Sequence, residues 1–64
     1  MSEEMAELSS LGTALGELTR RVASLAEQAA TRSDDEVSFE LFAVERALRG
    51  AGRRLERLTT PRGR

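Results

Sequence analysis

The sequence predicts an all-α protein, an antiparallel two-helix coiled-coil hairpin that dimerises into a four-helix bundle. Two runs of apolar residues repeat with alternating steps of three and four residues, which is the a/d heptad pattern of coiled-coil helices. A short segment of turn-forming and helix-capping residues separates the two runs. The chain of 64 residues has room for one domain, which we expect to span residues 1–64.

The first helix is expected from about residue 3 to residue 31. Ser2 is placed to cap its first turn. Glu3 and Glu4 follow, where acidic side chains complement the positive end of the helix dipole. The a and d positions of this helix form an apolar seam of Leu8, Leu11, Leu15, Leu18, Val22, Leu25 and Ala29.

A turn is expected at about residues 32–33, and the second helix from about residue 34 to residue 60. Ser33 and Glu36 have the S-x-x-E spacing of a capping box, in which the serine hydroxyl accepts from the glutamate N–H and the glutamate reaches back. Pro61 ends the helix and leaves residues 61–64 as a basic tail. The seam of the second helix consists of Val37, Leu41, Val44, Leu48, Ala51, Leu55 and Leu58.

A connection this short places the two helices side by side and antiparallel. Folding the chain back near Ser33 pairs an a position with a d position in every layer, and the register holds along the whole hairpin. The expected layers are Ala29 with Val37, Leu25 with Leu41, Val22 with Val44, Leu18 with Leu48, Leu15 with Ala51, Leu11 with Leu55, and Leu8 with Leu58.

Charge is distributed unevenly along the chain. Residues 1–45 contain ten acids and three arginines, a net charge of −7, whereas residues 46–64 contain seven arginines and one acid, a net charge of +6. The antiparallel fold brings the acidic N-terminal end beside the basic C-terminal end, so much of this asymmetry is neutralised within the hairpin. On one flank we expect two ion pairs between g positions, Arg21 with Glu40 and Glu7 with Arg54.

The composition argues against an enzyme. The chain has no Cys and no His, so we expect no catalytic residues, no cofactor and no zinc site of the usual kind. Helix capping explains the acids between residues 34 and 40 better than a metal site does. No apolar run approaches the ~18 residues of a membrane span, so we expect a cytoplasmic protein without membrane contact. All ten basic residues are arginine, a composition associated with GC-rich bacterial genomes.

A second surface is predicted to hold another copy of the chain. The b and e positions of the first helix carry no charge and one large side chain, and small residues would let a neighbouring backbone approach closely. The alternative is that the small residues reflect composition and that Phe42 folds over Ala26. The predicted self-association face consists of Met5, Gly12, Gly16, Thr19, Ala23, Ala26, Ala30, Phe42 and Gly52.

A partner-binding site is predicted on the back of the second helix. Phe39 occupies an f position, which points away from the seam and from the small-residue face. An aromatic side chain beside arginines can anchor a second protein, while the alternative is a ring that is merely exposed. The predicted site consists of Phe39, Ala43, Arg46, Arg49 and Arg53.

These features predict protein–protein interaction, by a self-associating small regulatory or scaffold adaptor. The alternative is a nucleic-acid-associated accessory factor, whose arginine ridge would track phosphates. The ridge consists of Arg46, Arg49, Arg53 and Arg57, with Arg62 and Arg64 beyond it. The net charge of −1 and an aromatic content of 3% favour the adaptor over the nucleic-acid factor.

Overall fold

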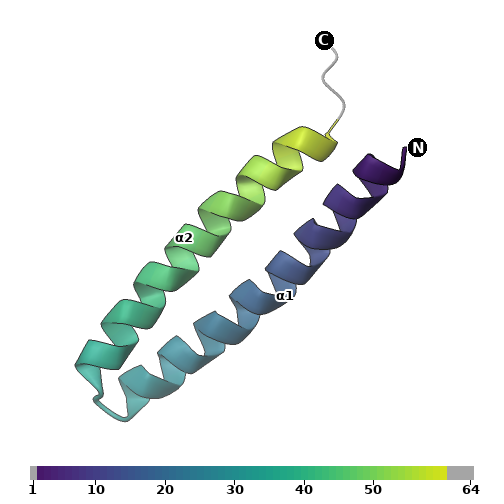
Figure 1. Cartoon of the computed structure of the whole chain (residues 1–64). Coiled ribbons are helices and arrows are strands. Elements are labelled where there is room, and N and C mark those ends of the chain that lie inside the picture. Colours follow the sequence, from purple (N-terminus) through teal and green to yellow (C-terminus); the bar gives the residue numbers. More distant parts are fainter. Residues whose placement is uncertain (1, 61–64) are drawn as a thin grey trace.

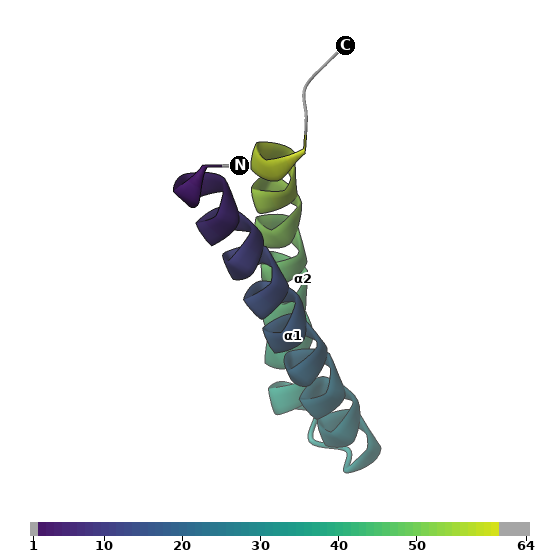
Figure 2. The same ribbon diagram turned by 90° about the vertical axis from the view of Figure 1, so that its right-hand side faces the viewer.

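The computed structural model of the chain describes residues 2–60. Helix α1 spans Glu3–Thr31 and helix α2 spans Asp35–Thr59. The helices run antiparallel and side by side, so that the start of α1 and the end of α2 lie at the same end of the hairpin (Figure 1). Figure 2 shows that they cross at a shallow angle. The predicted two-helix hairpin is therefore confirmed, and α2 begins and ends one residue inside its predicted span.

The start of α1 follows the predicted capping pattern. The Ser2 hydroxyl oxygen accepts a hydrogen bond from the Met5 N–H at 3.1 Å, which satisfies one of the free amides of the first turn. Glu3 and Glu4 lie in that turn, where their carboxylates face the positive end of the helix dipole. The predicted role of Ser2 is confirmed.

The turn between the helices differs from the prediction. Ser33 has a φ of 61°, in the left-handed region. Its N–H donates to the Ala30 carbonyl at 3.0 Å, and the Asp34 N–H donates to the Ala29 carbonyl at 2.9 Å. These two bonds form a Schellman motif, which ends α1. Asp34, not Ser33, is the N-cap of α2 and makes no side-chain cap bond, so the predicted capping box with Glu36 is wrong.

Replacing Ser33 by glycine is expected to stabilise the fold by roughly 0.5–1 kcal/mol. A left-handed conformation costs a residue with a Cβ roughly 1–2 kcal/mol. Glycine avoids this cost but loses more backbone entropy on folding, so the net stabilisation is smaller. The midpoint of urea unfolding measures the effect. Ser33→Ala is the matched control, because it keeps the Cβ, and equal stabilisation by both substitutions would show that backbone strain is not the cause.

Small residues occupy the centre of the contact between α1 and α2. Ala26 and Ala29 are fully buried, and Thr19 and Ser38 are 6% and 9% exposed. Within residues 2–60, no large side chain is fully buried. The large residues at the d positions are instead exposed, at 48% for Leu11, 44% for Leu18, 52% for Leu25, 42% for Val37, 44% for Val44 and 58% for Leu58. The prediction that both a/d seams are buried against each other is therefore wrong at the d positions.

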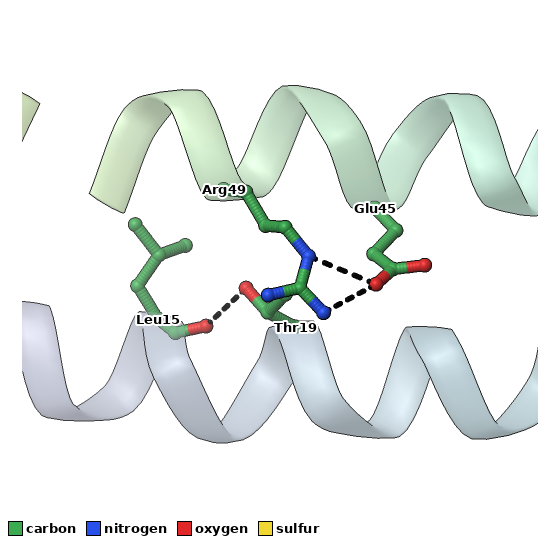
Figure 3. Close-up of polar contacts among 4 residues, drawn as sticks. All are labelled: Leu15, Thr19, Glu45 and Arg49. Atoms are coloured by element: carbon green, nitrogen blue, oxygen red, sulfur yellow. Dashed lines mark hydrogen bonds and ion pairs between the residues drawn. The ribbon is translucent and has the colours of Figure 1, made fainter. Parts of the chain in front are cut away.

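The helices are rotated so that each presents its a and e positions to the other. Small e residues let the backbones approach, and a Cβ on Gly52 would lie 3.8 Å from a methyl carbon of Leu15. The Thr19 hydroxyl donates to the Leu15 carbonyl at 2.7 Å (Figure 3), and the Ser38 hydroxyl donates to the Asp35 carbonyl at 3.3 Å. Both hydroxyls are thus paired within their own helix and are buried without an unmet hydrogen bond.

Two ion pairs predicted between the helices are not formed, namely Arg21 with Glu40 and Glu7 with Arg54. Within residues 2–60, the one ion pair joins Arg49 to Glu45 inside α2. The rotation of the helices explains the difference. With the a and e positions in the contact, the g positions that carry these four side chains point away from the neighbouring helix and are exposed.

Candidate protein-interaction surface

Both helices contribute their e and b positions to one side of the hairpin. A shallow groove runs between the helices on this side, because three of the residues that line it are glycines. Arg49 lies along the groove and is held by Glu45, whose Oε2 accepts from Nε at 2.9 Å and from Nη2 at 2.5 Å (Figure 3). The lining includes Leu8, Gly12, Leu15, Gly16, Thr19, Leu48, Arg49, Gly52, Arg53, Leu55 and Glu56.

The predicted self-association face lies on this groove side and serves mainly the contact between α1 and α2. Thr19 and Ala26 are buried within the single hairpin, and Ala30 alone of the nine residues is exposed. The other members are partly covered, namely Met5, Gly12, Gly16, Ala23, Phe42 and Gly52. These residues therefore offer little uncovered apolar surface to a second copy.

Replacing Gly12 by alanine is expected to stabilise the hairpin by about 1 kcal/mol. A Cβ at this position would meet no atom within 4 Å, so the higher helix propensity of alanine is gained without a clash. Urea unfolding measures the gain, and sedimentation of the same sample measures the mass. If a partner backbone packed on Gly12, as the predicted face requires, the added methyl group would weaken self-association instead.

The uncovered apolar surface lies on the opposite side of the hairpin. Consecutive residues of a helix point about 100° apart, so the d positions emerge away from the e positions that border the groove. We call this surface the leucine face. It consists of Leu11, Leu18 and Leu25 of α1 and Val37, Val44 and Leu58 of α2, whose exposed fractions range from 42% to 58%.

The hairpin exposes more surface than a compact protein of its mass. Its accessible surface is 5010 Å², whereas the scaling of surface with mass gives about 4,000 Å² for a compact monomer of 7.0 kDa. The excess of about 1,000 Å² is close to the ~800 Å² that each partner buries in a typical stable interface.

The predicted partner-binding residues are divided between two sides of α2. Phe39 is the most exposed large apolar residue, at 67%. Arg46 is exposed at an f position on the same outer side, and Ala43 lies beside it and is partly exposed. Arg53 is also exposed at an f position, but its side chain borders the groove as well. Arg49 belongs to the groove side, where Glu45 holds it.

No known protein family, no curated protein and no solved structure matches this chain. No helix within residues 2–60 is long and apolar enough to cross a lipid bilayer.

Two arginines of the predicted ridge interact within α2 itself. Arg49 is tied to Glu45 within α2, while Arg57 lies in the last turn, where a cation complements the negative end of the helix dipole. The basic tail that was predicted at residues 61–64, with Pro61, Arg62 and Arg64, lies outside the described residues. Arg46 and Arg53 are exposed at f positions of α2, and Arg53 also borders the groove.

Proposed function

We propose that this chain is a self-associating protein-interaction module, a small regulatory or scaffold adaptor that packs its helices against other proteins and performs no catalysis. The leucine face carries this proposal. It places six large aliphatic side chains on one side of a chain of 64 residues, each 42% to 58% exposed. Large apolar side chains gathered on one side of a small protein favour a site of protein contact there. The lack of Cys and His in the chain supports a non-catalytic role.

A second copy of the chain is the partner that the leucine face fits first. The hairpin measures 47 by 21 by 12 Å, a flat shape with two broad sides. Two hairpins stacked through their leucine faces form a four-helix bundle, in which the d residues of all four helices share one core. This arrangement covers the exposed leucines and valines at once and removes the excess surface of the single hairpin.

The rim of the leucine face is compatible with an identical copy. The g positions along this rim hold one acid and one arginine on each helix, so the rim carries no net charge. None of these four side chains is in an ion pair within residues 2–60, which leaves them free to meet charges of a second copy. They are Glu7 and Arg21 of α1 and Glu40 and Arg54 of α2.

Sedimentation equilibrium over a range of protein concentrations tests the proposal. The expected mass is about twice the 7.0 kDa of the chain. Helical content, followed by circular dichroism on the same dilutions, should fall as the dimer dissociates, because mass action links folding to association when the single hairpin has few buried side chains. A helical species that keeps the mass of one chain at the highest concentrations would overturn the proposal.

A further inference from the structure

We propose that the outer side of α2 binds an acidic amphipathic helix of another protein. We call this surface the outer strip, and it consists of Phe39, Ala43, Arg46, Gly50 and Arg53. Its f positions point about 160° away from the d positions of the leucine face. A dimer that forms through the leucine face therefore leaves the outer strip open to a different partner.

The apolar part of the outer strip begins with the large side chain of Phe39 and continues with two small residues, Ala43 and Gly50. Phe39 is 67% exposed, so most of its ring surface is available to a partner. Ala43 follows one turn later, and a Cβ on Gly50 would meet only the Arg53 guanidinium, at 3.8 Å. No atom of α1 lies within 4 Å of that Cβ, so a partner helix that displaces the flexible Arg53 side chain can approach the α2 backbone near Gly50. A partner helix can pack along these small residues while the Phe39 ring inserts between side chains of the partner.

The charged part of the outer strip selects acidic side chains. Arg46 and Arg53 are exposed, and neither is in an ion pair within residues 2–60, whereas Glu45 already holds Arg49. They lie seven residues apart, or ~10 Å along the axis, which matches carboxylates two turns apart on a partner helix. A guanidinium beside an apolar surface binds a carboxylate through two parallel hydrogen bonds.

The charge along the outer strip also fixes where the acids of the partner must lie. Glu36 and Glu40 are close to Phe39 in sequence, at the start of α2, so the end of the strip near Phe39 repels acids. The partner therefore places apolar residues on Phe39 and carboxylates over Arg46 and Arg53. A nucleic acid fits less well, because its phosphates run uniformly along the strand and would meet the two glutamates, and the chain has only two aromatic side chains with which to stack bases.

Two outer strips, one on each hairpin, would make the dimer a bivalent adaptor that holds two partner helices. This step rests on the proposed dimer, whereas binding to one outer strip does not. Peptide binding and dimer formation are distinguished by measuring both the number of peptides bound per chain and the mass of the chain in solution. One bound peptide per chain is expected whether the chain sediments as one copy or as two.

Isothermal titration of the full chain with a synthetic peptide tests the inference. The peptide is an amphipathic helix with leucines on one face at one end and glutamates seven residues apart on the same face at the other end. A second peptide has lysines in place of the glutamates. The acidic peptide is expected to bind, with about tenfold or greater weakening by Phe39→Ala and by the double substitution of Arg46 and Arg53 by glutamine. The lysine peptide is expected not to bind.

The matched control replaces Arg20 and Arg32 by glutamine, because these exposed arginines lie on α1 and at its C-cap, away from the outer strip and from the rim of the leucine face. This variant should bind the acidic peptide as the natural chain does. Equal binding of both peptides, or unchanged binding by Phe39→Ala, would overturn the inference. Retention of duplex DNA at low salt by the natural chain, lost in the Arg46 and Arg53 variant, together with no binding of the acidic peptide, would overturn it in favour of a nucleic-acid partner.

Discussion

Replacing Leu18 by glutamate is expected to dissociate the proposed dimer and to lower its helical content together. Leu18 lies in the middle of α1 on the leucine face and is 44% exposed in the single hairpin, so a second copy would cover it. Loss of leucine burial and desolvation of a carboxylate cost about 2 kcal/mol per copy, or about 4 kcal/mol per twofold dimer. The dissociation constant should therefore rise about a thousandfold, as measured by sedimentation equilibrium.

The matched control is Phe39→Glu, which also puts a glutamate in place of an exposed apolar side chain, on the opposite side of α2. This variant should keep the mass and the helical content of the natural chain. If both substitutions dissociated the dimer, either the contact would include the outer side of α2 or any added negative charge would weaken association. A Leu18→Glu chain that remains dimeric at the same concentration would show that the leucine face is not the contact.

The number of helices and their antiparallel course follow from local rules that the sequence displays directly. Apolar residues at steps of three and four define each helix, and Ser2 supplies the hydroxyl that the first turn requires. The turn was harder to predict, because Ser33 fits two motifs at once. Its hydroxyl suits an N-cap, but its backbone is needed in the left-handed conformation that ends α1, and the N-cap role passes to Asp34.

The side of each helix that faces its neighbour was not predictable from the heptad pattern. Heptad counting ranks positions by hydrophobicity, and by that measure Leu18 and Leu25 belong in the contact. The structure instead places Thr19 and Ala26 there, one residue further along, because small side chains let the two backbones approach closely. A rotation by less than one residue spacing thus exchanged the buried and exposed sides of α1.

The same rotation explains which site residues could be located from the sequence. The small residues that were assigned to an outer face lie in or beside the contact between α1 and α2, and the d residues that were assigned to the core form the leucine face. Phe39 was placed correctly on the outside, since an f position is far from both candidate contact strips. The acidic partner proposed for it is not deducible from the heptad pattern alone, because the absence of ion pairs at Arg46 and Arg53 within residues 2–60 is a property of the folded hairpin.

Ala26→Leu is expected to cause the largest loss of stability within a single hairpin. Ala26 is fully buried, so a leucine there must force α1 and α2 apart or shift the backbone, at a cost of about 2–3 kcal/mol. Ala30→Leu is the matched control, because Ala30 is exposed one turn further along α1, and its effect should stay within ~0.5 kcal/mol. Urea unfolding at one protein concentration measures both. A stable Ala26→Leu chain would mean that the helices can turn back to bury Leu18 and Leu25, in which case the leucine face would close and the same chain should lose its tendency to dimerise.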